Sequence, residues 1–314
     1  MTKTFADRVC EQVKLKKSHA VVGLDPVINR IPSFILKEAE LQYGKNPNGA
    51  GYAFYEFNKM IIDAVCDKVA IVKPQLAYYE VYGAAGIKAF WNTVTYAQEK
   101  GLLVIADAKR GDIDSTATAY ATSFFDELHN EWKEQIRVDS LTINPYLGDD
   151  SLQPFIDSAT QSHAGLFILV KTSNPRSGDI QELVANGREV AEKVAEMVND
   201  YAQQTLGDSA YSPVGAVVGA TYPEAQAKYR KLMPNSLFLV PGYGTQGAKG
   251  KDIVNAFNED GLGALISASR SIIYAYEQAD EVNRDSVMYY VSNAVAAMNE
   301  DINTALSEVN NLQW

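Results

Sequence analysis

A short segment of the chain, "DAKRGDI" from Asp107 to Ile113, places oppositely charged side chains directly behind an apolar run. Asp107, Lys109 and Asp112 alternate in sign, and Lys73 follows another apolar run earlier in the chain. Neighbouring carboxylates favour the ammonium form of a lysine, so Lys109 is suited to hold and donate a proton rather than to act as an amine nucleophile. A purely structural ion-pair network is the alternative interpretation.

A second segment, "VPGYGTQGAKG", contains Gly242, Gly244 and Gly247. Glycines let backbone amides approach an anion, and Arg270 behind the next apolar run offers bidentate charge-assisted contacts. Together these segments predict a phosphate-binding site and a phosphorylated substrate. The same glycines match the dinucleotide fingerprint GxGxxG, but that fingerprint belongs to an early unit of an open sheet. A glycine-rich turn without a ligand is the remaining alternative.

Histidine chemistry and metal-ion chemistry are both disfavoured. His19, His129 and His163 do not stand behind the apolar runs that end in polar residues, which argues against a histidine acid–base or nucleophile triad. Asp107 and Asp112 offer oxygen ligands for Mg2+, but the lysines beside them neutralise that charge and repel a cation. We expect no metal ion.

Eight short β-rich runs alternate with segments of helical periodicity, and these elements must position the charged residues. Phe54, Phe57, Ile61 and Val65, for example, are spaced as one face of a helix. Eight apolar strands that alternate with helices in 314 residues favour a closed parallel barrel. We therefore predict an α/β fold, a single-domain (β/α)8 TIM barrel over residues 1–314. The expected strands are 19–24, 69–73, 102–107, 140–144, 165–170, 214–219, 236–240 and 263–267.

The carboxyl ends of the strands should bring polar residues together, because a barrel gathers these ends at one rim. Two other segments are predicted from their own patterns. Residues 43–52 are rich in glycine and asparagine and predict a surface loop, and an apolar stripe over about 285–309 predicts a long C-terminal helix. The polar residues that follow the expected strands are Asp25, Lys73, Asp107, Asn144, Thr172, Gln246 and Arg270.

Composition and charge limit the class of protein. The net charge of -11 argues against a general nucleic-acid or acidic-membrane binder, although it leaves room for a local basic pocket. The N-terminal segment lacks the apolar core of a signal peptide, and no apolar run approaches the ~18 residues of a membrane span. Cys10 and Cys66 lack CxxC or metal-ligand spacing and are expected to be free thiols, which favours a cytoplasmic protein.

From "VGLDP" to "SASRS", nearly its whole length, the sequence resembles the orotidine 5'-phosphate decarboxylase family. The motif "DAKRGDI" is highly specific for that family, and "VKPQLAYYE" and "KTSNP" resemble its longer bacterial form. The resemblance implies conversion of orotidine 5'-monophosphate to UMP and CO2 in pyrimidine biosynthesis, without a cofactor. It also implies a homodimer with shared active sites.

The resemblance implies roles for individual residues. Lys73, Asp107, Lys109 and Asp112 would form a charged tetrad in which Lys109 donates the proton and Asp112, with Thr116, comes from the partner subunit. The substrate-binding residues that it implies are Asp25 at the ribose, Asn144 and Pro241 near the base, Gln246 between base and phosphate, Arg270 at the phosphate, and Thr172, Gly242, Gly244 and Ser269.

Two alternative functions stay open. One is a metal-dependent sugar-phosphate aldolase or synthase of the same barrel superfamily, because hexulose-phosphate synthase shares an Asp-x-Lys-x-x-Asp pattern. That function predicts dependence on Mg2+. The other is a non-catalytic nucleotide-binding barrel, which would bind UMP and leave the charged residues idle.

Overall fold

The strands are built from nearly continuous apolar runs, as strands buried on both faces require. In the computed structural model, which describes residues 2–125, 136–220, 223–244, 247–312 and 314, eight parallel strands close into a barrel in the order β1-β10-β9-β8-β5-β4-β3-β2. The predicted (β/α)8 barrel is therefore confirmed. His129 and Gln246 lie outside the described residues. The barrel strands are β1 (Ala20–Leu24), β2 (Ile71–Pro74), β3 (Leu103–Arg110), β4 (Ser140–Ile143), β5 (Gly165–Lys171), β8 (Ser212–Val218), β9 (Ser236–Pro241) and β10 (Ala264–Ala268).

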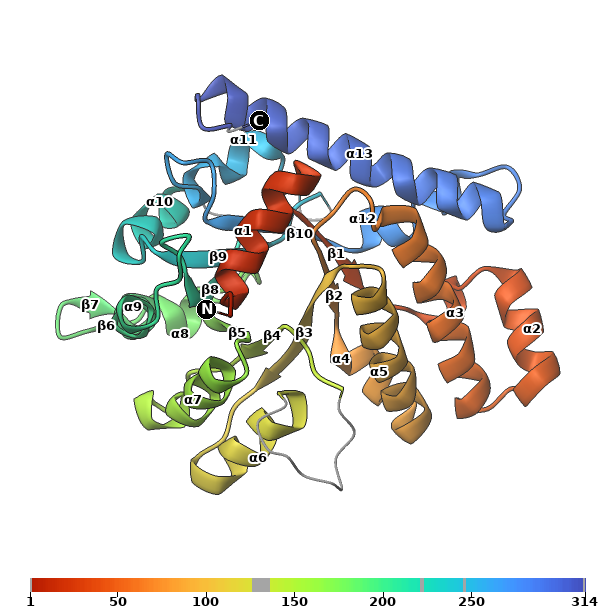
Figure 1. Ribbon diagram of the computed structural model, residues 1–314, viewed down its shortest axis with the longest axis horizontal. Helices are drawn as coiled ribbons and strands as arrows, with labels where there is room; N and C mark the ends of the chain where they lie inside the picture. Colours follow the sequence, from red (N-terminus) through yellow and green to blue (C-terminus); the bar gives the residue numbers. More distant parts are fainter. Residues whose placement is uncertain (1, 126–135, 221–222, 245–246, 313) are drawn as a thin grey trace.

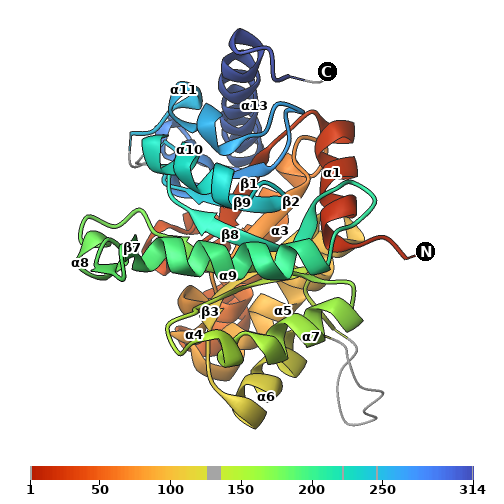
Figure 2. The same ribbon diagram turned by 90° about the vertical axis from the view of Figure 1, so that its left-hand side faces the viewer.

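Helices surround the barrel on its outer face (Figure 1). The helix α13 lies along one side beside α11 and α12, and α2 lies outermost beside α3. Figure 2 shows α9 lying beside β8, and α9 also contacts α10. A small hairpin of β6 (Val184–Ala185) and β7 (Arg188–Glu189) follows β5. The helices are α1 (Phe5–Lys16), α2 (Ser33–Tyr43), α3 (Pro47–Val65), α4 (Leu76–Glu80), α5 (Gly83–Glu99), α6 (Asp114–Phe124), α7 (Gln153–Gln161), α8 (Gly178–Gln181), α9 (Val190–Gln204), α10 (Pro223–Leu232), α11 (Gly250–Ile253), α12 (Arg270–Ile273) and α13 (Arg284–Glu308), with short 3-10 turns at Ile28–Arg30, Asp149–Ser151, Val254–Ala256 and Ala275–Gln278.

Two layers of apolar side chains form the core. The outer layer fills the space between strands and helices and includes the predicted stripe of α3, from Phe54 to Val65. The inner layer fills the barrel and is covered by α1 at the end where the strands begin. There the ring of Phe5 meets Phe167 edge to face at 6.1 Å, and a Cβ on Gly165 would lie only 2.1 Å from the Phe5 ring. Since α1 closes this end, the opposite end is the place for a site.

The prediction of a surface loop over residues 43–52 is wrong. The helix α2 ends at Tyr43 and α3 begins at Pro47, so the connection covers only residues 44–46. Asn46 starts α3 because its side-chain oxygen accepts hydrogen bonds from the backbone N–H groups of Asn48 and Gly49. Pro47 occupies the first helical position, where its missing N–H costs nothing.

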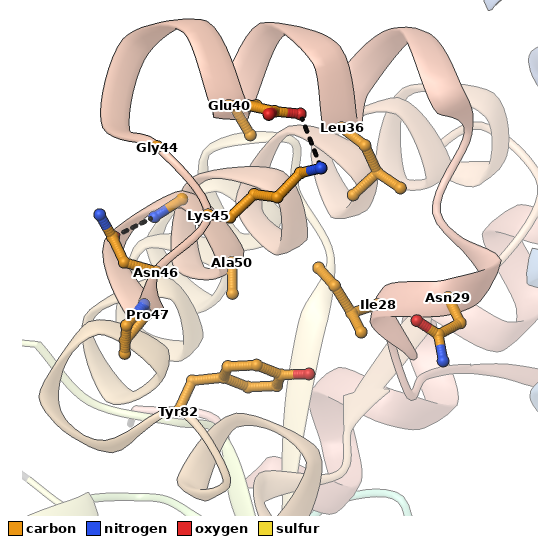
Figure 3. Close-up of a pocket in the computed structure, with 12 residues that line it drawn as sticks. Ile28, Asn29, Leu36, Glu40, Gly44, Lys45, Asn46, Pro47, Ala50 and Tyr82 are labelled. Atoms are coloured by element: carbon orange, nitrogen blue, oxygen red, sulfur yellow. Dashed lines mark hydrogen bonds and ion pairs between the residues drawn. The ribbon is translucent and has the colours of Figure 1, made fainter.

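The glycines of this segment allow close packing of helices rather than a loop. A Cβ on Gly49 would lie 2.3 Å from the carbonyl oxygen of Gly44, and one on Gly51 would lie 2.7 Å from that of Ala85. The connection between α2 and α3 forms one wall of a mainly apolar pocket of about 480 Å3, with the ring of Tyr82 opposite (Figure 3). None of the residues that line this pocket belongs to the predicted site.

The expected C-terminal helix is α13, which begins after Asn283, whose side-chain oxygen accepts from the N–H of Ser286. Val309, the last residue of the expected stripe, lies just beyond the helix and is 45% exposed. Among the described residues, no helix has both the length and the apolar character needed to cross a membrane. The buried residues of the stripe are Val287, Val291, Val295, Met298, Ile302 and Leu306.

Candidate active site

A cavity of about 410 Å3 opens at the carboxyl end of the barrel, where the predicted site residues were expected to gather. Charged residues at the ends of β2 and β3 line it together with Thr142 of β4, the segment after β5 and Pro241 at the end of β9. The apolar side chains of Leu169, Val217 and Leu239 complete the lining. Charged groups thus face a largely apolar space, in which electrostatic interactions are stronger than in water.

Asp107 holds both lysines of the cavity. Its Oδ2 lies 2.7 Å from Lys73 Nζ and its Oδ1 lies 2.5 Å from Lys109 Nζ. Burial opposes ionisation of Asp107, but the positive charges of Lys73 and Lys109 outweigh it and hold the pKa of Asp107 well below its usual range. Burial also opposes the charged form of Lys73, yet the charges of Asp107 and Asp25 raise the pKa of Lys73. Both buried groups are therefore ionised at neutral pH.

Lys109 has an unusual backbone conformation. Its φ is +48°, in the left-handed region that non-glycine residues rarely adopt, and the register of β3 against β4 shifts between Ala106 and Arg110. The side chains of Asp107 and Lys109 therefore meet on a strand that is not regularly extended between them. Thr142 fixes the irregular segment, since its Oγ1 accepts from the Lys109 N–H and donates to Asp107 Oδ1, both at 3.0 Å. Backbone strain of this kind is typical of functional sites.

Asp25 follows β1 as predicted, close enough for its charge to act on Lys73. Its Oδ1 is buried and has no hydrogen-bond partner among the described residues. Such an oxygen is costly in a folded protein unless a ligand or water supplies a donor, so it is a suitable place for a ligand hydroxyl. Ser269, behind β10, lies near the same strand, because a Cβ on Gly23 would be 2.7 Å from Ser269 Cβ.

The segment after β5 is fixed by Gln181 of α8. The Thr172 N–H donates to Gln181 Oε1 at 3.0 Å, and Gln181 Nε2 donates to Thr172 Oγ1 at 2.8 Å. The Thr172 hydroxyl donates in turn to Asn174 Oδ1 at 2.7 Å. Thr172 and Asn174 both line the cavity. Asn144 instead lines a neighbouring cavity of about 520 Å3, because its Oδ1 folds back to accept from the N–H of Tyr146.

The glycine loop behind β9 and the segment behind β10 lie side by side. Gly242, Gly244 and Gly247 have φ values of +105°, +72° and +87°, which residues other than glycine rarely adopt. A Cβ on Gly244 would lie 3.2 Å from Ser271 Oγ, so the loop packs against the neighbour of Arg270. Arg270 is exposed at the start of α12. The two predicted phosphate-binding segments are therefore adjacent.

Asp112 and Thr116 lie outside the cavity. Asp112 Oδ1 accepts a hydrogen bond from the N–H of Ile113 at 2.8 Å, and Asp112 forms no ion pair with Lys73 or Lys109 in the part of the chain that the structure describes. Thr116 is exposed in the first turn of α6. A single chain thus brings together three of the four predicted charged residues.

Sequence reasoning missed Thr142, Ser173 and Asn174. Thr142 is a polar residue within a fully buried strand, a pattern that could have identified it. Ser173 and Asn174 follow Thr172 directly and line the same cavity. Across the described ranges, no three His, Cys, Asp or Glu side chains are grouped as ligands of a metal ion would be.

Comparisons with known proteins agree with this geometry. A family model for the orotidine 5'-phosphate decarboxylase / HUMPS family matches residues 54–284. The orotidine 5'-phosphate decarboxylase of Rhodopirellula baltica is 40% identical over 305 residues, which cover 95% of this chain and 99% of the relative. That of Caldicellulosiruptor bescii is 37% identical over 305 residues, with coverage of 96% and 99%. The solved structure of Leishmania donovani OMP decarboxylase has a TM-score of 0.69 and 31% identity, with coverage of 95% and 99%. The chain belongs to the orotidine 5'-phosphate decarboxylase / HUMPS family.

Proposed function

We propose that the chain converts orotidine 5'-monophosphate to UMP and CO2 as a carboxy-lyase of pyrimidine biosynthesis. The observation that carries the proposal is the buried Asp107 carboxylate, held between Lys73 and Lys109 in a cavity at the carboxyl end of the barrel. The curated relatives that cover nearly the whole chain bear the name of this activity.

Lys109 supplies the positive charge that the reaction needs. When the bond between C6 of the pyrimidine and the carboxylate breaks, CO2 leaves and the electron pair stays on C6 in the plane of the ring. The π system cannot delocalise a pair in that plane, so a fixed cation must stabilise it. The ammonium group of Lys109 meets this need and then gives a proton to C6, and solvent returns a proton to its amine. No cofactor takes part in this scheme.

Asp107 acts on the leaving carboxylate. Two unit charges ~4 Å apart at an effective dielectric constant near 20 interact by roughly 4 kcal/mol. If the substrate carboxylate lies at such a distance from Asp107, this repulsion disappears as neutral CO2 forms. The two lysines keep Asp107 ionised and fixed, so the site needs little reorganisation during the reaction.

The phosphate lies at the other side of the cavity mouth in this proposal. Arg270, the amides of the loop with Gly242 and Gly244, and Gln246 bind it, and Gln246 also reaches the base. Binding of this remote group offsets the unfavourable placement of two carboxylates near one another, which is how binding energy distant from the reacting atoms raises a rate.

Residues of six strand ends hold the nucleoside in this proposal. The orphan Oδ1 of Asp25 accepts a ribose hydroxyl, with Lys73 beside it. Thr172 and Pro241 line the cavity near the base. Ser269 and Asn144 stand at the rim, and Asn144 reaches the pyrimidine only if its side chain turns away from the N–H of Tyr146.

We also propose a homodimer with shared active sites, in which Asp112 and Thr116 reach the cavity of the other subunit. Near Asp112, Arg110 links the helices α4 and α6. Its guanidinium forms an ion pair with Glu80 of α4 and lies 5.6 Å from the centre of the Tyr120 ring in α6. The segments that follow β2, β3 and β4 carry exposed apolar side chains, which protein interfaces commonly bury. They are Tyr78, Val81, Ile113, Tyr120, Tyr146 and Leu147.

The sugar-phosphate alternative is less well supported by the site. Both oxygens of Asp107 are engaged by lysine ammonium groups, which leaves this carboxylate poorly suited to bind Mg2+. The family description covers this class as well, so the assignment depends on the curated relatives and on the charged array. A non-catalytic nucleotide-binding barrel would not need the strained Lys109.

The test is the ultraviolet absorbance of orotidine 5'-monophosphate with purified protein and excess EDTA, with the Lys109→Ala variant in parallel. We expect loss of the orotate chromophore and formation of UMP with the wild type, and rates near background with a folded Lys109→Ala variant that still binds UMP. Turnover of a pentulose or hexulose phosphate that EDTA abolishes would support the alternative. UMP binding without turnover by the wild type would support the non-catalytic barrel.

The shared site has its own test. Mixed dimers of Lys109→Ala and Asp112→Asn contain one site with both residues intact, so verified heterodimers should regain part of the activity. Absence of recovery would contradict the shared geometry.

We propose further that the chain acts as one domain in the cytoplasm, in agreement with the unpaired thiols of Cys10 and Cys66.

A further inference from the structure

One carboxylate oxygen outside the cavity binds both ends of the glycine loop. Asp301 lies on α13, and its Oδ2 accepts from the Tyr243 hydroxyl at 2.6 Å and from the Gly250 N–H at 2.7 Å. Tyr243 lies between the first two glycines of the loop, and Gly250 starts α11 where the loop ends. A single side chain of the C-terminal helix therefore fixes the entry and the exit of the loop.

The backbone contacts support the same arrangement. A Cβ on Gly250 would lie 2.5 Å from the Asp301 carbonyl oxygen, so this glycine allows the loop to lie directly on α13. Within the loop, the Gly244 N–H donates to the Ala248 carbonyl and the Gly247 N–H donates to the Gly244 carbonyl, both at 2.9 Å. These bonds connect the described parts of the loop, which Asp301 attaches to a 25-residue helix.

The position of the loop matters because its backbone N–H groups can bind the phosphate only when they point at it. Amide dipoles stabilise an anion only when their N–H groups point at it, and displacement by about 1 Å is enough to lose much of the gain. Gly244 packs against Ser271, so the position of the loop also sets its place relative to Arg270. Asp301 does not line the cavity, and it can act on the substrate only through the loop.

We propose that Asp301 is a positioning residue for the phosphate group, acting through Tyr243 and Gly250. The inference rests on the proposed function, since it names the structural support of its phosphate site. It predicts a defect that is larger for phosphorylated than for unphosphorylated substrates, because the loop amides and Arg270 bind the phosphate in this proposal, whereas the reacting residues Asp107 and Lys109 lie on another strand. A residue that merely docked α13 would affect phosphorylated and unphosphorylated substrates alike.

The experiment compares orotidine 5'-monophosphate with orotidine, which lacks the phosphate. For Asp301→Ala we expect kcat/KM for the phosphorylated substrate to fall by about tenfold or more, the factor that corresponds to about 1.4 kcal/mol. The value for orotidine should fall by a clearly smaller factor. Tyr243→Phe keeps the bond from Gly250 to Asp301, and Asp301→Asn keeps an acceptor oxygen. The kcat/KM of both variants should therefore lie between the values of Asp301→Ala and the wild type. Glu300→Gln removes a neighbouring exposed charge of the same helix and should behave as the wild type.

Two outcomes would overturn the inference: an unchanged kcat/KM in Asp301→Ala, or equal losses for both substrates. Calorimetric affinities for UMP and uridine separate this inference from the proposed function. If the wild type binds UMP but shows no turnover, the proposed function fails, and weaker binding of UMP alone by Asp301→Ala still supports the role of Asp301. Equal affinity of variant and wild type for UMP would contradict that role in either case.

Discussion

Replacement of Thr142 by valine tests how the charged array is held. The change removes one hydroxyl and nearly keeps the shape of the side chain, so it isolates the bonds to the Lys109 N–H and to Asp107 Oδ1. Thr142 is only 1% exposed, so water has little access to replace the hydroxyl. Asp107 keeps its lysine partners in this variant but loses the contact that sets its rotation relative to β4.

The expected effects follow from these two bonds. A hydrogen bond to a charged group contributes about 1.5–3 kcal/mol, and about 1.4 kcal/mol corresponds to a factor of ten. If Asp107 and Lys109 act as proposed, kcat/KM should fall by about 10- to 100-fold in Thr142→Val. The N–H of Lys109 loses its acceptor, which should lower the free energy of unfolding by about 1–3 kcal/mol.

The assay combines initial rates of chromophore loss with urea unfolding. Thr142→Ser keeps a hydroxyl and should recover most of the activity. Thr93→Val is the matched control, because Thr93 is equally buried in α5 and its hydroxyl bonds to the Ala89 carbonyl, away from the site. That variant should lose stability without loss of kcat/KM. A Thr142→Val enzyme with reduced stability and wild-type kcat/KM would refute the role of this hydroxyl in the array.

Three further residues give predictions of other kinds. Burial lowers the pKa of His19 to about 3, below the ordinary 6.5, so its contribution to stability is complete above pH 6.5 and is lost as the pH falls. The free energy of unfolding should drop by about 2 kcal/mol between pH 7 and pH 5, and His19→Phe should remove that drop; an identical pH profile in the variant would contradict this. The guanidinium of buried Arg230 donates to the backbone carbonyls of Ala256, Met233, Ser236 and Gly263, and the three donors of a lysine cannot reach all of them. Arg230→Lys should therefore lower the free energy of unfolding, measured in urea, by about 3 kcal/mol and leave kcat unchanged. Gln181→Leu removes both hydrogen bonds to Thr172 and should lower kcat/KM by about tenfold. Adding Thr172→Val should lower kcat/KM little further, and fully additive losses would show that the two side chains act separately.

The barrel and the charged rim were predictable from the sequence because each depends on a local pattern. Apolar runs mark strands buried on both faces, and polar residues behind them mark the ends that a barrel gathers. The chemistry of Asp107 and Lys109 is visible in their charges alone. The conformation of Lys109 is not, because its positive φ is stabilised by Thr142 of another strand.

Other features depended on contacts that no local pattern reveals. Gly49 and Gly51 suggested a loop, yet they lie in a helix and are glycine because backbone carbonyls from other segments approach them closely. Asn144 follows its strand as expected, but a turn bond to Tyr146 directs its side chain away from the cavity. Asp112 accepts a hydrogen bond from the N–H of Ile113, but within the described residues it forms no ion pair with the lysines of the cavity.

The arrangement of the strands links the phosphate site to the rate of reaction. The reacting array lies on β2 and β3, whereas the glycine loop and Arg270 follow β9 and β10, with β1 between β2 and β10 in the closed sheet. A substrate bound at both places spans the mouth of the barrel. The closed ladder of parallel strands holds the distance between these places nearly constant, so a shift of the phosphate moves C6 relative to Lys109. A misplaced phosphate loop should therefore reduce kcat as well as affinity, because alignment at the reacting atom depends on both ends of the substrate.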